Sequence, residues 1–224
     1  MRTVILVPRR PDGGPRDLLW DWCRTRWGRE HPDLEVFEGA HPGKGPFNRA
    51  LALNRAAAAA GDWDVAVVAD ADSFVGADQV DTAIGLAATS GQMVMAFDRW
   101  CALDEAMTTQ ILGGYDGNWW PGVTVAMTDT CSSMFAVPRP LWDECAGFDE
   151  RHQGWGAEDF SFAHAARTFG DGWQRIEGAC WHLWHPTGRR DPARVAANVA
   201  LADRYHAAAG DPDAMRALIA EATS

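Results

Sequence analysis

Short apolar runs alternate with longer segments of helical periodicity along the first 98 residues of the chain. The four runs are residues 3–8, 34–37, 65–69 and 92–98, and the segments between them are 16–28, 46–61 and 77–91. Apolar runs of this length, bounded by turn residues, are typical of buried strands. Each longer segment ends at a glycine, a common helix stop. Alternating strands and helices predict a parallel sheet with crossover helices.

The pattern is less regular after residue 98. The stretch 99–130 contains GGYDGNWWPG and is predicted to be rich in loops. The expected elements beyond it are a strand at 133–138, a short helix at 138–147, a helix at 157–170 and an extended segment at 173–186. Two tail helices are predicted because Asp191-Pro192 and Asp211-Pro212 each place an acidic cap before a proline.

The whole pattern predicts an α/β fold, with a mostly parallel central sheet flanked by helices. A length of 224 residues fits one domain. We expect that domain at residues 1–190, with a helical extension at 191–224 packed on it. The longest N-terminal apolar run, Val4–Val7, is too short for a signal peptide or a membrane span. The expected location is therefore cytoplasmic, with no membrane span.

Composition narrows the classes of partner. The net charge of −11 is unfavourable for a protein that holds a nucleic-acid backbone. An anionic ligand must then be met by a few arginines or by a metal ion. Five scattered cysteines without a CxxC pair argue against a disulfide framework and a zinc ribbon, and favour buried, reduced thiols.

The stretch DVAVVADADSFV places Asp70 and Asp72 at the end of a buried strand. Ligands of open α/β sheets bind beyond the carboxyl ends of the strands. An isolated DxD is a weak signal, and a solvated turn or helix cap is its more common explanation. The functional interpretation is a divalent cation that binds carboxylate oxygens and the phosphates of a substrate.

A second candidate segment is GFDERHQGWGAEDFSF. Gly154 and Gly156 flank Trp155, and Glu158-Asp159 follow at the start of a helix. Acids there also complement the helix dipole. An aromatic residue between glycines, next to an acid pair, suggests a sugar platform beside a general base. The indoles of this chain's glycine-rich loops either pack or stack on a flat ligand.

The third and fourth candidates are histidines and arginines. His182 and His185 in CWHLWHP are either hydrogen-bonded core residues or metal ligands, and imidazole suits Mn-like ions better than Mg²⁺. Arg9 and Arg10 follow the first strand, and Arg49 opens a helix. They either pair with phosphate or are solvated at the surface.

Taken in order, these segments resemble the GT-A glycosyltransferases, especially the β-1,4-galactosyltransferase family and its family 2 relatives, including polypeptide N-acetylgalactosaminyltransferase-type catalytic domains. The resemblance rests on VPRR, PFNRALALN, DVAVVADAD, GFDERHQGWGAED and CWHLWH, and spans about Val4 to Pro186. It implies a Rossmann-like GT-A domain, a nucleotide diphosphate-sugar donor (UDP-sugar above all) and Mn²⁺ or Mg²⁺.

The resemblance also implies residue roles. The donor would be bound by Pro8, Arg9, Arg10, Phe47, Arg49 and Asp70. The metal would be held by Asp72 with His182, or with His185 as the second choice. Trp155 and Gly156 would cover the donor and shape the acceptor site. Glu158 would hold sugar hydroxyls, and Asp159 would be the catalytic base of an inverting transfer.

The sequence departs from the family where Ala157 replaces the second glycine of GWGGED and where Phe160, not a further acid, follows Asp159. The acceptor therefore stays open between a glycan, a protein hydroxyl, a small molecule and a modified nucleobase, and the net charge disfavours nucleic acid. The alternatives are a nucleotidyltransferase that makes sugar nucleotides, which VPRRPDGGPRD imitates faintly, and a non-catalytic module that binds nucleotide sugars. GWGAED has no role in the first, and the second needs no base.

Overall fold

The computed structural model describes residues 1–41, 45–188 and 190–223, which form two sheets and their covering helices. The strands are β1 (Thr3–Arg9), β2 (Glu35–Ala40), β3 (Val65–Ala69), β4 (Ser73–Phe74), β5 (Met93–Met95), β6 (Arg99–Leu103), β7 (Val123–Met127), β8 (Met134–Pro138), β9 (Trp173–Arg175) and β10 (Ala179–His182). The helices are α1 (Pro15–Glu30), α2 (Arg49–Ala60), α3 (Ala77–Ser90), α4 (Glu105–Leu112), α5 (Arg139–Glu144), α6 (Glu158–Phe169), α7 (Pro192–Ala208) and α8 (Pro212–Thr223).

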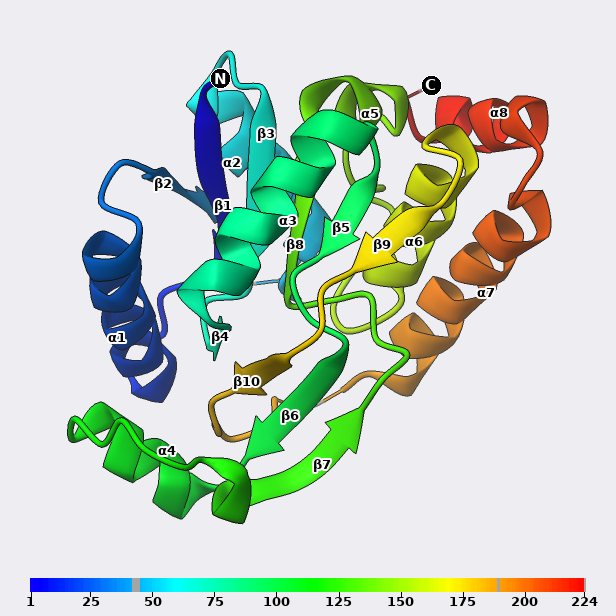
Figure 1. Cartoon of the computed structure of the whole chain (residues 1–224). Helices are drawn as coiled ribbons and strands as arrows, with labels where there is room; N and C mark the ends of the chain where they lie inside the picture. Colours follow the sequence, from blue (N-terminus) through cyan, green and yellow to red (C-terminus); the bar gives the residue numbers. More distant parts are fainter. Residues whose placement is uncertain (42–44, 189, 224) are drawn as a thin grey trace.

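The main sheet has the strand order β2-β1-β3-β8-β5-β9. Its central strands β3 and β8 are buried along their whole length. In Figure 1, α3 lies in front of this sheet and α2 behind it. The alanine-rich sequence of α2 allows a close approach to the sheet, and Gly39 of β2 has no room for a side chain beside the Ala52 carbonyl. These features confirm the predicted α/β fold with helices on both faces.

The main sheet is mixed, so the prediction of a mostly parallel sheet is wrong in this respect. β1 runs parallel to β2 and β3, and β5 runs parallel to β9. β8, however, is antiparallel to both of its neighbours, β3 and β5. The strand–helix alternation stops before β8. The chain reaches β8 from the second sheet rather than through a crossover helix, so β8 can start at the opposite end of its neighbouring strands and run antiparallel to them.

The segment of residues 99–130 has more regular secondary structure than predicted. Residues 99–130 contain β6, α4 and β7, and GGYDGNWWPG lies between the last two. Among the described strands, β7 pairs with β6 alone, and four of its five residues are exposed. Its sequence, VTVAM, is rich in β-branched residues, but it directly follows the strong loop signals of GGYDGNWWPG. The second sheet, with the order β4-β10-β6-β7, lies below the main sheet in Figure 1.

The tail forms the two predicted helices. The Asp191 carboxylate accepts a hydrogen bond from the Ala193 amide, and the Asp211 carboxylate accepts two, from Asp213 and Ala214. Both helices pack against α6 (Figure 1). A domain boundary at residue 190 stays a prediction.

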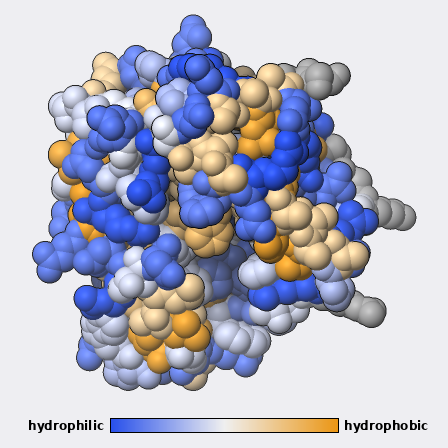
Figure 2. All heavy atoms as spheres, turned by 90° about the vertical axis from the view of Figure 1, so that its right-hand side faces the viewer, coloured by the Kyte–Doolittle hydropathy of each residue, from blue (hydrophilic) through white to orange (hydrophobic). Residues whose placement is uncertain are grey.

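The surface and the thiols agree with the composition. Figure 2, which views the side of α7 and α8, shows apolar residues only in small patches among polar ones. None of the described helices is both long and apolar enough to cross a membrane. All five cysteines are buried and free, as predicted.

Candidate functional site

The pairing of β4 with β10 brings together residues that are far apart in sequence. His182 of β10 lies opposite Ser73 of β4, and the Leu183 amide donates a hydrogen bond to the Asp72 carbonyl at 2.9 Å. This register places Asp72 beside His182 and, three residues further on, His185. The Asp72 carboxylate lies 3.6 Å from Nε2 of His182 and 3.2 Å from Nε2 of His185.

This group, which we term the imidazole cluster, has the composition of a metal site. One ligand atom from each of Asp72, His182 and His185 lies within 4.8 Å of the others. Burial opposes the charge on Asp72, but the two imidazoles hold the pKa of its carboxyl well below its usual range. The hydrogen bond to Asp72 raises the pKa of His185. Two imidazole nitrogens and one carboxylate fit Mn²⁺.

A second group gathers around Arg49, the first residue of α2. The buried Asn48 caps this helix, accepting a hydrogen bond from the Leu51 amide at 2.9 Å. The Arg49 guanidinium then reaches the Asp70 carboxylate at 2.7 Å and the Asp159 carboxylate at 2.6 Å. Glu158 lies 3.8 Å away. Because Asp70 follows β3 and Asp159 opens α6, this carboxylate cluster joins three elements.

Three acids share one guanidinium in the carboxylate cluster. Burial and the neighbouring Asp159 raise the pKa of Glu158 to about 8, although Arg49 opposes the shift. Burial also raises the pKa of Asp159, against the opposing effect of Arg49. One Glu158 oxygen, Oε2, is buried without a hydrogen-bond partner. At neutral pH this part of the site therefore holds a neutral carboxyl group, which can donate a hydrogen bond.

The candidate donor-binding residues at the C-terminal end of β1 divide into two groups. Pro8 is buried in β1, and Arg9 is bonded to Asp17 at 2.6 Å and to Glu38 at 3.1 Å. Arg9 is thus neutralised by acids outside both clusters. The Arg10 guanidinium instead lies 5.6 Å from the centre of the Phe47 ring and has no carboxylate partner among the described residues. Arg10 and Phe47 therefore lie together, whereas Arg9 is bonded to acids outside both clusters.

The Trp155 segment is held by the tail helix α7. Trp155 is 56% exposed, Gly156 has a φ of 104°, and the Arg190 guanidinium lies 3.6 Å from the indole centre. The buried Asn198 amide donates to the backbone carbonyls of Gln153 and Trp155 at 3.1 and 3.2 Å. The left-handed φ of Gly156 explains why glycine occupies this position.

Two residues beside the clusters were missed by the sequence analysis. Arg16, at the start of α1, places its guanidinium 3.3 Å from Nδ1 of His185. Its signal was its place after the glycine-rich loop that follows the first strand. The Ser132 side chain lies beside Asp159 and lowers the pKa of its carboxyl, against the effect of burial. A serine in an irregular stretch carries no pattern, so the sequence could not have indicated it.

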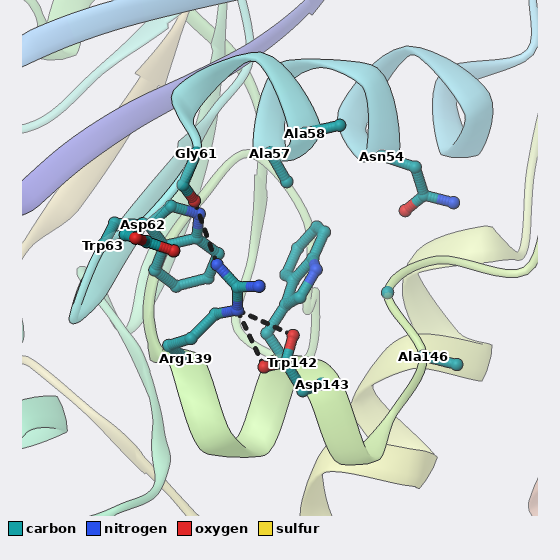
Figure 3. Close-up of a pocket in the computed structure, with 11 residues that line it drawn as sticks. Asn54, Ala57, Ala58, Gly61, Asp62, Trp63, Arg139, Trp142, Asp143 and Ala146 are labelled. Atoms are coloured by element: carbon teal, nitrogen blue, oxygen red, sulfur yellow. Dashed lines mark hydrogen bonds and ion pairs between the residues drawn. The ribbon is translucent and has the colours of Figure 1, made fainter.

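A cavity of about 490 Å³ lies apart from both clusters (Figure 3). Trp63, Trp142 and the Arg139–Asp143 ion pair contribute to its wall, and no residue of either cluster lines it. Trp63 precedes β3, whereas Asp70 follows β3, so the cavity lies at the opposite end of the strands from the two clusters. It is therefore not part of the candidate site.

Comparison of the sequence with models of protein families found no match, and comparison with curated proteins also found none. Several solved structures are nevertheless similar in fold. The catalytic domain of Drosophila β1,4-galactosyltransferase 7, in complex with xylobiose, matches with a TM-score of 0.58 at 16% identity, over 91% of this chain and 80% of that chain. A mutant of that enzyme with manganese, UDP-Gal and xylobiose matches with a TM-score of 0.51 at 16% identity, over 80% of this chain and 65% of that chain.

A third structure, GalNAc-T7 with UDP, GalNAc and Mn²⁺, matches with a TM-score of 0.55 at 13% identity. The match covers 92% of this chain but only 49% of GalNAc-T7, so this chain corresponds to about half of that protein. At such identities the similarity concerns the fold. The chain has the GT-A glycosyltransferase fold that its sequence motifs resemble.

Proposed function

We propose that this protein is a metal-dependent glycosyltransferase that moves a sugar from a nucleotide diphosphate-sugar, with UDP as the first candidate, to an acceptor hydroxyl. The observation that carries the proposal is that Asp72, His182 and His185 place one ligand atom each within 4.8 Å of the others, beyond the C-terminal end of β3. The carboxylate cluster adjoins the same end of β3, because Asp70 lies two residues before Asp72. A cation site next to buried acids supplies the two kinds of group that sugar transfer needs. The solved structures of this fold that contain UDP and manganese support the assignment.

The imidazole cluster would hold the cation. Asp72 and His182, with His185, supply nitrogen and oxygen ligands, which favours Mn²⁺ over Mg²⁺. A bound divalent ion would offset the charge that builds up on the departing nucleoside diphosphate. Arg16 lies beside His185 without a carboxylate partner among the described residues, so its guanidinium is available to the diphosphate.

The nucleotide would bind along the end of β1. The Arg10–Phe47 pair offers a cation and an aromatic ring to the nucleobase, next to Pro8. Arg49 would bind the donor from within the carboxylate cluster while holding Asp70 in place. Arg9 is already neutralised by Asp17 and Glu38, so we propose that it orders this edge rather than binding phosphate.

Asp159 would remove the proton from the acceptor hydroxyl. Its raised pKa makes its carboxylate a stronger base than an exposed aspartate. The acceptor oxygen would attack the anomeric carbon from the face opposite the diphosphate, and a single displacement would invert that carbon. Glu158, as a neutral carboxyl, would donate a hydrogen bond to a sugar hydroxyl, and Trp155 with Gly156 would cover the donor.

Donor hydrolysis without an acceptor tests this function. The protein is incubated with UDP- and GDP-sugars and Mn²⁺, and released nucleoside diphosphate and free sugar are measured. We expect slow, metal-dependent hydrolysis of one donor, with inverted configuration in the first-formed sugar. Exchange of pyrophosphate into the donor would indicate a nucleotidyltransferase instead. Tight donor binding without hydrolysis, in the presence of candidate acceptors, would indicate a binding module.

A further inference from the structure

A turn of two serines, Ser132-Ser133, joins the two clusters. Ser133 is 3% exposed and has a φ of 72°, in the left-handed region. A serine in this conformation is uncommon, and it persists where surrounding contacts hold it in place. Such conformations are frequent at functional sites, so the contacts of the turn identify what it supports.

The turn contacts three segments of the site. The Ser133 carbonyl accepts a hydrogen bond from the Asp70 amide at 2.8 Å, and the Ser132 side chain lies beside Asp159. The Ser133 hydroxyl accepts a second hydrogen bond, from the indole N–H of Trp100 at 3.0 Å. The first bond fixes the turn to Asp70 of the carboxylate cluster, and the second extends to the second sheet.

Trp100 connects the turn to the imidazole cluster. It lies on β6 opposite Cys180 of the parallel strand β10, so it shares a face with His182 two residues further along β10. The indole and imidazole centres are 5.2 Å apart. Among the residues that the structure describes, no hydrogen bond fixes the His182 ring. Its orientation therefore depends on Trp100, on the His185 ring and on the charge of Asp72.

We propose that Trp100 and Ser133 are positioning residues for His182. The Ser133 hydroxyl fixes the indole, the indole fixes the imidazole, and the Ser133 carbonyl binds the Asp70 amide. The proposed metal ligand His182, in the second sheet, is thereby connected to the carboxylate cluster at the end of β3. The role in metal binding rests on the proposed function, whereas the orientation of His182 does not.

The decisive variant is Ser133→Gly. Glycine adopts the left-handed conformation without strain, which offsets the loss of one hydrogen bond, so the melting temperature should change little. The variant lacks the hydroxyl that holds Trp100, so the His182 ring should lose its fixed orientation. If the role of Ser133 were purely structural, a variant with a stable fold would not have a disturbed His182 ring. Trp100→Phe removes the same hydrogen bond from its other end and retains an aromatic ring.

The first measurement needs no metal. In protein labelled with ¹⁵N-histidine, the His182 ring signals should shift or broaden in Ser133→Gly and in Trp100→Phe. They should not change in Trp63→Phe, a matched loss of a buried indole at the opposite edge of the sheet. Unchanged His182 signals in a folded Ser133→Gly protein would overturn the proposal, whatever reaction the protein catalyses.

The second measurement uses Mn²⁺ alone, by calorimetry. Groups that orient metal ligands typically affect affinity by about 10–100-fold, and we expect about a 10-fold loss in Ser133→Gly. The double variant Trp100→Phe/Ser133→Gly should lose little more Mn²⁺ affinity than either single variant. Both substitutions remove the same hydrogen bond, between Trp100 and Ser133. If the wild-type protein bound no Mn²⁺, the metal-dependent function would fail, and the His182 signals would still decide the positioning role. Full Mn²⁺ affinity in both single variants would overturn the proposal.

Discussion

The imidazole cluster and the carboxylate cluster adjoin the same edge of the sheet, but their electrostatics are opposite. In the imidazole cluster one acid faces two imidazoles, and the pKa of Asp72 is lowered despite burial. In the carboxylate cluster three acids face one guanidinium, and burial raises the pKa of Glu158 and Asp159. Burial opposes charge in both, so the number of cationic neighbours decides the outcome. The first cluster is thus suited to a metal ion, and the second to proton transfer.

Asp159→Asn is expected to have the largest effect, because it removes the proposed base and leaves the imidazole cluster intact. A general base typically contributes about 10²–10⁴-fold to the rate. We expect a loss of that size in the kcat of sugar transfer, with unchanged Mn²⁺ affinity. The comparison is tested by measuring transfer and Mn²⁺ binding on the same preparation. Turnover equal to that of the wild type would remove Asp159 from the mechanism.

Arg49→Met tests whether the carboxylate cluster depends on Arg49, the cation that faces its three acids. Removing one partner of a buried ion pair typically costs about 3–5 kcal/mol, and we expect a loss of unfolding free energy of that order at pH 8 by denaturant titration. The loss should be smaller at pH 5, where protonation of Glu158 relieves part of the repulsion. Arg9→Met is the matched control, since Arg9 also binds two acids, but more exposed ones. Equal losses at both pH values would contradict the account.

Glu158→Gln should have a smaller effect that depends on pH. Burial raises the pKa of Glu158 to about 8, above its value in the unfolded chain. The folded state therefore binds the proton more tightly, and wild-type stability falls as pH rises from about 4.5 to about 8. Glutamine does not titrate, so the melting temperature of the variant relative to wild type should increase over this range. The exposed Glu105→Gln is the control, and a difference independent of pH would show that Glu158 is charged throughout.

The sequence predicted the elements of the main sheet. It also predicted that the candidate site residues follow the carboxyl ends of its strands. The apolar runs that became β1, β3 and β8 are buried along nearly their whole length, and residues in such strands have a readable pattern. The reversed direction of β8 could not be read, because direction depends on the path of the chain through the second sheet. That sheet was missed because β7 is short and directly follows the loop signals of GGYDGNWWPG.

The candidate site was predictable as a set of residues but not as two clusters. Asp72 and His182 could be grouped by their resemblance to a family, and the β4–β10 register now explains why they meet. The separation of Asp70 from Asp72 could not be predicted, although only one residue stands between them. Asp70 points to Arg49 and Asp72 to the histidines because of tertiary contacts. The same is true of Ser132 and Trp100, which have no sequence signal for their roles.

The central claim is that the imidazole cluster holds a divalent cation, and calorimetry with Mn²⁺ tests it most directly. We expect the wild-type protein to bind one Mn²⁺, and Asp72→Ala to bind it more than about 100-fold more weakly, beyond the loss typical of groups outside the ligand set. Asp62→Ala, which changes an exposed acid at the opposite edge of the sheet, should bind like the wild type. Equal affinities in Asp72→Ala and wild type would contradict the account.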